Sequence, residues 1–187
     1  LTAFSQASML HIRNGGTVRI DPAEFNESYM MHGSTSPQYN MIASLDVATR
    51  MMQDNGEVMM QDIIGEAVQL RRKTASLARE FAAKGDWFFD LWQPRQITID
   101  GRRIDFCDAP AEYLSTRQEP WIMSSADNWH GFEGIEENYV MLDPIKLTFT
   151  TPGIADDGTM QPTGIPASIV TNYLISHNIV CEKTDYY

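Results

Sequence analysis

The stretch Ile145-Lys146-Leu147-Thr148-Phe149-Thr150 alternates apolar and polar side chains without interruption. This period of two is typical of a half-buried β-strand. Farther along, Pro166 can open a helix that ends near His177 and has apolar residues on one face. Residues 179–182 then form a second apolar stretch of strand length. The order strand, helix, strand predicts an α/β fold.

The first half of the chain predicts two helices. Pro37 suits the first helical position behind Ser36 as N-cap, and apolar residues recur on one face up to the stop signal Asp54-Asn55-Gly56. A second, longer helix follows and ends at Lys84-Gly85. The methionines on these faces are interpreted as core filler. They are Met30, Met31, Met51, Met52, Met59 and Met60.

Two β-hairpins are predicted from turn signals. Asn14-Gly15-Gly16 can form a tight turn between residues 9–13 and 17–20. In a second predicted hairpin, Ile97 and Ile99 face Ile104 and Phe106 across a turn at residues 100–103. Apolar residues occupy every second position on both sides of this turn. Residues 107–142 are rich in Pro, Asp, Ser and Trp and have no periodicity, so we predict an irregular connecting segment there.

Composition narrows the class of protein. Hydrophobic residues make up 43% of the chain, which favours a packed globular fold. The formal net charge of −11 disfavours nucleic acid and anionic membrane surfaces as partners. It is compatible with a small cationic ligand, but a soluble acidic surface is the favoured explanation. No apolar run is long enough for a membrane span, and no leader peptide is evident. Cys107 and Cys181 are expected to be reduced thiols, and we expect a cytoplasmic protein.

The best candidate site read from the residues alone is Ser34-Thr35-Ser36-Pro37. Three hydroxyls and the free N–H groups of a helix start together form a site for an anion such as a phosphate. An ordinary Ser N-cap followed by proline explains the same residues. Glu182, at the end of a predicted strand, reads by itself as a solvated edge residue.

Other chemistries find little support. The four histidines lack metal-ligand spacing, and Asp156-Asp157-Gly158 is not followed by a closing glutamate, so no metal site is expected. We expect His130 to be a hydrogen-bonded interior histidine and His177 to interact with a helix end. No Gly-x-Ser-x-Gly motif supports a hydrolase.

Several motifs in one order carry a family resemblance. The chain begins with LTAFSQASMLH (residues 1–11), and further motifs follow along nearly its whole length. These are YMMHGSTSP (29–37), WFFDLWQP (87–94), WHGF (129–132), LDPIK (142–146), TPG (151–153), TGIPA (163–167) and EKT (182–184). Together they resemble the bacterial ornithine/lysine/arginine decarboxylases.

The resemblance implies a fold of the aspartate aminotransferase type (fold type I) and pyridoxal phosphate as cofactor. It places the cofactor-binding lysine two residues before Leu1, so the 187-residue chain alone is expected to be inactive. It assigns Ser34, Thr35 and Ser36 to the cofactor phosphate of a neighbouring subunit, which implies a homodimer or larger homo-oligomer. The resemblance further implies that residues 1–106 are the last part of the cofactor-binding large domain and that residues 143–187 are the first part of a C-terminal α/β domain. Residues 107–142 would be an irregular segment that connects the two.

The resemblance also implies a small cationic amino acid as substrate. In lysine- and arginine-type members the acid matching Glu182 can face the distal cation of the substrate. Asp185-Tyr186-Tyr187 and the 105–110 segment look more like the ornithine type, so ornithine is the first expected substrate and lysine or arginine the alternatives. Two rival functions remain: an inactive homologue that regulates or assembles with a decarboxylase, and a related aminotransferase.

Overall fold

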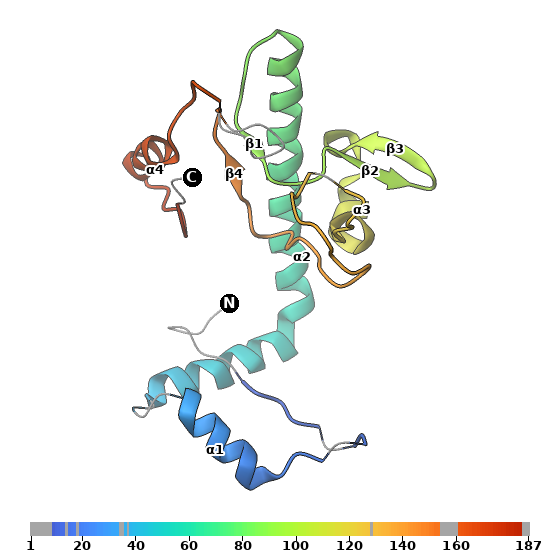
Figure 1. Cartoon of the computed structure of the whole chain (residues 1–187). Helices are drawn as coiled ribbons and strands as arrows, with labels where there is room; N and C mark the ends of the chain where they lie inside the picture. The colour runs from blue at the N-terminus through green and yellow to red at the C-terminus, as the bar shows by residue number, and fades with distance from the viewer. Residues whose placement is uncertain are drawn as a thin grey trace. The chain divides into compact units, whose positions relative to one another are not determined.

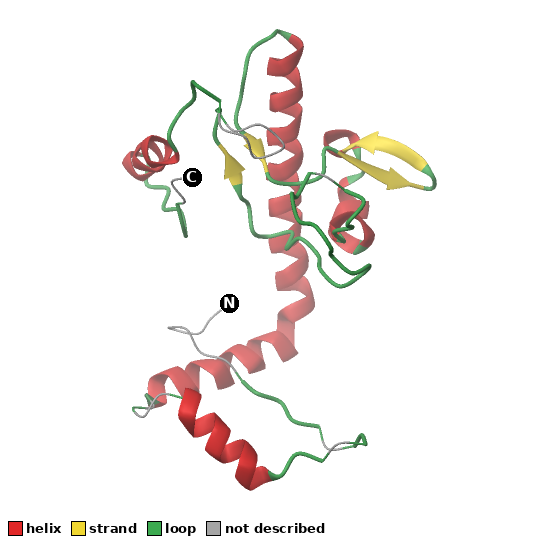
Figure 2. Cartoon of the chain, viewed as in Figure 1, coloured by secondary structure: helices red, strands yellow, loops and turns green. Residues whose placement is uncertain are grey.

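The computed structural model describes residues 9–13, 15–17, 19–33, 36, 38–127, 129–153 and 161–184 (Figure 1). The chain divides into two compact units, Leu1–Met59 and Met60–Tyr187. The described residues combine helices with short antiparallel strands (Figure 2). No described helix has both the length and the hydropathy needed for a membrane span. The predicted domain bounds at 106/107 and 142/143 remain predictions.

The first unit contains helix α1, Pro22–His32, which the sequence analysis did not predict. Asp21 caps it by accepting a 2.8 Å hydrogen bond from the Ala23 N–H, and Pro22 occupies the first turn. The hairpin predicted before it is wrong, because the described residues between 9 and 20 contain no strand. Met9, Leu10, Ile12 and Ile20 are exposed, and an isolated two-stranded hairpin without a packed face is only marginally stable.

Helix α2, Tyr39–Ala83, is one helix of 45 residues where two were predicted. It begins two residues after Pro37, so the predicted N-cap at Ser36 is wrong. It also continues through Asn55-Gly56. Gly56 is buried, and a Cβ there would lie 3.0 Å from the Cε of Met52, one turn earlier in α2, so the helix continues through this position despite the weak helix propensity of glycine.

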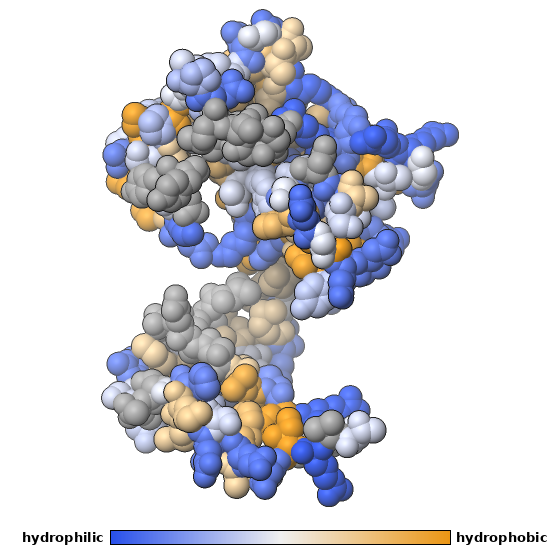
Figure 3. Space-filling model, viewed as in Figure 1, coloured by the Kyte–Doolittle hydropathy of each residue, from blue (hydrophilic) through white to orange (hydrophobic). Residues whose placement is uncertain are grey.

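The predicted end of α2 is confirmed. The Asp86 N–H donates to the Phe81 carbonyl at 3.0 Å and the Gly85 N–H donates to the Ala82 carbonyl at 3.1 Å. Gly85 has a φ of +76°, which completes a Schellman motif. The methionine prediction holds less well, since Met30 and Met31 are 59% and 78% exposed and Met52 is also exposed, whereas Met51, Met59 and Met60 are half-buried. Hydrophobic residues are accordingly visible at the surface (Figure 3).

The second predicted hairpin is confirmed as β2, Gln96–Ile99, and β3, Arg102–Asp105. Ile97 lies opposite Ile104, as expected, while Ile99 lies opposite Arg102. The turn is shorter than predicted, because Asp100 and Gly101 alone form it with φ angles of 50° and 75°. Two successive positive φ values give a turn whose twist matches that of the flanking strands.

The core of the second unit lies largely in the segment predicted to be irregular. That segment contains 3₁₀ turns at Phe106–Asp108 (η1) and Glu119–Trp121 (η2), separated by helix α3, Ala111–Thr116. The Trp121 indole N–H donates to the Leu114 carbonyl at 2.9 Å. The buried cluster consists of Val68, Ile97, Phe106, Ala109, Leu114, Trp121 and Leu142.

The predicted strand at 145–150 forms only over its last two residues. There β4, Phe149–Thr150, pairs antiparallel with β1, Asp90–Leu91 (Figure 1). Helix α4, Ala167–Ser176, follows Pro166 as predicted and ends at His177. The strand predicted at 179–182 is wrong, since these residues pair with no described strand and Val180 is 82% exposed. The fold therefore mixes helices and strands, and the fold type I arrangement remains a prediction.

Candidate functional site

A buried arginine on α2 fixes the segment that leads to β4. The Arg71 guanidinium is fully buried and donates to the backbone carbonyls of Pro144, Asp143 and Lys146 at 2.9, 3.2 and 2.6 Å. It also donates to the Gln93 Oε1 at 3.0 Å. Its carbon Cζ lies 5.4 Å from the ring centroid of Trp121. Residues 143–146 are thereby attached to the helix.

Within the described part of the chain, no carboxylate accepts a hydrogen bond from Arg71. Burial lowers the pKa of Arg71 to about 10, and the nearby charge of Asp143 acts in the opposite direction. The group therefore stays positively charged near neutral pH. Its charge is balanced mainly by the dipoles of carbonyl groups, which satisfy its donors.

Lys146 connects this segment to the predicted substrate residue Glu182. The Lys146 Nζ lies 2.5 Å from the Glu182 Oε2, and the two side chains are 57% and 77% exposed. The hydrogen bond that Lys146 donates to Glu182, followed by the negative charge of Glu182, raises the pKa of Lys146. The hydroxyl oxygens of Thr171 on α4 and Thr184 are 2.7 Å apart and share a hydrogen bond. This contact attaches the chain to α4 two residues after Glu182.

The predicted phosphate site is described only in part. Ser34 and Thr35 lie outside the described residues, as do residues 1–8, the Asp156-Asp157-Gly158 turn and residues 185–187. Ser36 is exposed and comes shortly before the first turn of α2, where the Ile42 N–H donates to the Gln38 carbonyl at 3.2 Å. An exposed hydroxyl just before a helix N-terminus is a donor that fits a phosphate. Ser36 belongs to the first unit and Glu182 to the second, and each is described by itself.

His130 confirms its predicted structural role. It is buried, its Nδ1 accepts from the Phe132 N–H at 3.0 Å, and its Nε2 lies 2.8 Å from the Ser124 carbonyl oxygen. These partners fit the tautomer in which Nε2 is the donor and Nδ1 the acceptor. His177 lies at the C-terminus of α4, with its Nδ1 2.9 Å from the Tyr173 carbonyl oxygen, also as expected.

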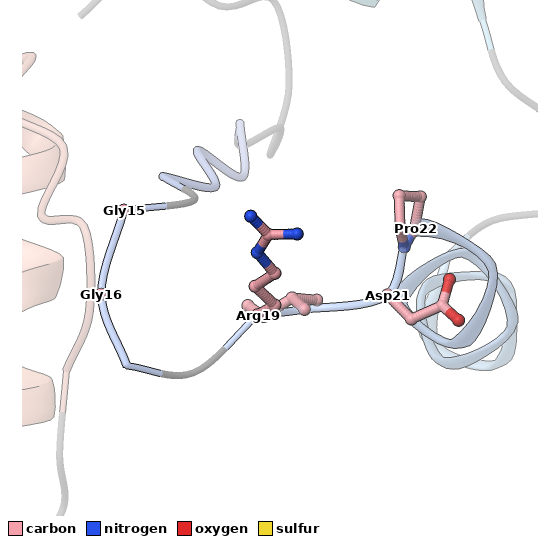
Figure 4. A pocket seen from close by; sticks show the side chains of 6 residues that line it. Gly15, Gly16, Arg19, Asp21 and Pro22 are labelled. Carbon is pink, nitrogen blue, oxygen red and sulfur yellow. The ribbon is translucent and has the colours of Figure 1, made fainter.

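Metal chemistry and the hollow beside the start of α1 add no further function. The described residues contain no group of three or more metal-ligating side chains, and both cysteines are free and half-buried. A hollow of about 640 Å³ is lined by the glycine turn, Arg19, Ile20, Asp21 and Pro22 (Figure 4). The Asp21 carboxylate in this hollow already caps α1.

Sequence reasoning missed Arg71 and Lys146. Arg71 follows Ile64 and Val68 at helical spacing, so a charged residue on an apolar face was a visible signal. Lys146 was assigned to the polar side of a strand. Its partner lies 36 residues away in sequence, and no local pattern indicates that contact.

Comparisons with known proteins cover the whole chain. The family model described as "Orn/Lys/Arg decarboxylase, major domain" matches residues 1–187. The chain is 45% identical over 187 residues to the biodegradative arginine decarboxylase of Escherichia coli, covering 98% of this chain and 25% of that protein. It is 32% identical over 188 residues to an inducible ornithine decarboxylase of a Lactobacillus, covering 97% of this chain and 24% of that protein.

A structural comparison agrees. The solved structure of lysine decarboxylase A from Pseudomonas aeruginosa matches with a TM-score of 0.71 and 44% identity, covering 99% of this chain and 23% of that one. The chain thus spans about a quarter of the length of the relatives it matches.

Proposed function

The chain belongs to the Orn/Lys/Arg decarboxylase family, and on that premise we propose that its parent protein is a pyridoxal-phosphate-dependent carboxy-lyase. The parent removes CO₂ from a basic amino acid and releases the corresponding amine. The observation that carries the proposal is the match of the family model to every residue from 1 to 187.

The substrate is an amino acid with a distal cation, and Glu182 binds that cation. Its carboxylate is exposed and already accepts a hydrogen bond from an ammonium group, which is the chemistry that a distal amine or guanidinium supplies. Relatives named for arginine and lysine are 35–45% identical to this chain, against 30–32% for those named for ornithine, which supports arginine and lysine before ornithine as substrates. This reverses the order that the C-terminal motif suggested.

The cofactor phosphate is held by the hydroxyls of Ser34, Thr35 and Ser36. When bound, pyridoxal phosphate supplies the electron sink that decarboxylation requires. The protein supplies donors for the phosphate at the loop before α2 and a carboxylate for the substrate's far end. We further propose that the parent is at least a homodimer, because the family resemblance assigns Ser34, Thr35 and Ser36 to the site of a neighbouring subunit.

The proposal is tested by product analysis of the intact parent protein. Incubation with arginine, lysine and ornithine in the presence of pyridoxal phosphate should release CO₂ and the matching amine from at least one of them. Glu182→Gln should raise KM for that substrate by about two- to fivefold, because an ion pair with an exposed carboxylate contributes about 1 kcal/mol or less. A parent that releases no CO₂ from any of the three would instead favour an inactive homologue.

A further inference from the structure

The proposed substrate carboxylate is engaged by a cation of the chain itself. The Lys146 ammonium lies 2.5 Å from the Glu182 Oε2, and the two residues are 36 positions apart in sequence. A primary ammonium on a flexible alkyl chain is also the distal group of lysine and ornithine. Lys146 therefore makes with Glu182 the contact that the substrate would have to make.

The backbone on both sides of this pair is held in place. The buried Arg71 donates a 2.6 Å hydrogen bond to the Lys146 carbonyl, and the Thr171–Thr184 hydroxyl contact holds the chain two residues after Glu182. Such anchoring keeps the ammonium close to the carboxylate, so its effective local concentration is high. Substrate in solution must compete against it.

The ammonium of Lys146 is nevertheless free to leave. Its side chain is 57% exposed, and an ion pair in contact with water is weak because both charges are well solvated when apart. Displacement moves the ammonium into solvent without burying a charge. The anchored backbone stays where it is.

We propose that Lys146 is a specificity-determining residue that occupies the Glu182 carboxylate until the distal cation of a substrate displaces it. The inference rests on the proposed function, in which Glu182 binds that cation. An amino acid with a neutral tail cannot displace Lys146, whereas an ammonium or guanidinium can. Lys146 is thus an internal competitor that raises the apparent KM for a substrate with a distal cation by a factor equal to the inverse of the fraction of time that Glu182 is free of Lys146.

The test is the kinetics of Lys146→Met in the intact parent protein with its cofactor. Removing the competitor should lower KM for the preferred substrate by about two- to fivefold, which is the occupancy expected of a weak surface ion pair. Lys146→Arg keeps a cation on Glu182 and should leave KM at or above the wild-type value. A gain in apparent affinity is a result that general structural damage does not produce.

Two further measurements separate the possible causes. In a Glu182→Gln background, Lys146→Met should have no further effect on KM, because the competitor has lost its site. Lys84→Met is the matched control: Lys84 pairs with Glu80 at 2.7 Å, with exposures of 56% and 58%, and its loss changes the net charge equally. KM should be unchanged in that variant.

The outcomes distinguish the two proposals. If Glu182→Gln leaves KM unchanged for arginine, lysine and ornithine, the proposed role of Glu182 fails and the inference fails with it. If Glu182→Gln raises KM but Lys146→Met leaves it unchanged or raises it, only the inference fails. If the parent shows no turnover, calorimetry can measure the binding of the product amines instead. Absence of both turnover and binding would overturn the proposed function and the inference about Lys146.

Discussion

The guanidinium of Arg71, fully buried on α2, donates a 2.6 Å hydrogen bond to the backbone carbonyl of Lys146, 75 residues later in the chain. This contact joins the longest helix to the segment that precedes β4. It also places the backbone of Lys146 where its side chain reaches Glu182. The energetic importance of this junction can be measured directly.

Arg71→Met should lower the unfolding free energy of the parent by roughly 2 to 5 kcal/mol, because it removes the four hydrogen bonds that this buried side chain donates. Arg72→Met is the neighbouring control. The Arg72 Nε is buried without a hydrogen-bond partner in the described part of the chain, so its loss should change stability by less than about 1 kcal/mol. Chemical denaturation of both variants gives the comparison, and equal losses would contradict the anchoring role of Arg71.

Acid stability should depend on Arg79. Its guanidinium hydrogen-bonds Asp108 and lowers the pKa of that carboxyl, and Gln96, followed by Arg79, lowers the pKa of Asp105. Carboxyl groups with lowered pKa values stabilise the fold above their unfolded pKa of about 4, and this contribution is lost as pH falls through their folded pKa values. Arg79→Met should therefore reduce the drop in Tm between pH 5 and pH 3. An identical drop in both proteins would argue against the coupling.

Substitution of two glycines by alanine should have opposite effects on stability. Gly101 has a φ of +75°, so Gly101→Ala should destabilise the protein by about 1 kcal/mol. Gly65 lies inside α2, and a Cβ there would meet nothing within 4 Å, so Gly65→Ala should stabilise by roughly 0.5 to 1 kcal/mol. Shifts of the same sign in Tm would be inconsistent with these backbone roles.

Cofactor retention tests the proposed role of Ser34 in binding the phosphate. Ser34→Ala in the intact parent should weaken pyridoxal phosphate binding by roughly 1 to 3 kcal/mol through loss of one donor to the phosphate. The release of cofactor on dilution, followed by absorbance of the filtrate, measures this. The Tm of the cofactor-free protein serves as control and should stay the same. Wild-type cofactor affinity in the variant would remove Ser34 from the site.

Local signals predicted the elements whose geometry is set by a few adjacent residues. Asp100-Gly101 specified its turn, Gly85 ended α2, and Pro166 opened α4. The errors arose where distant contacts decide the outcome. Asn55-Gly56 favoured a helix end by propensity, but Gly56 is buried inside α2.

The same contrast between local signals and distant contacts holds for the core and for the candidate site. Ala109, Leu114 and Trp121 come from short helical turns, so their burial leaves no periodicity in the sequence. Glu182 was a sequence candidate because of its motif. Its engagement by Lys146 depends on chain folding over 36 residues, and the buried Arg71 could have been suspected only as a charge on an apolar helical face.

Because the Arg71 side chain is fully buried and donates its hydrogen bonds to backbone carbonyl groups, dissolved salt has little access to its contacts. The Lys146–Glu182 pair is open to solvent, and mobile ions screen such pairs over about 8 Å at physiological ionic strength. Ionic strength thus acts on one end of the junction and spares the other. Raising it should loosen the lysine from the carboxylate while the backbone beneath stays fastened, so salt becomes a reversible means of opening Glu182 without mutation.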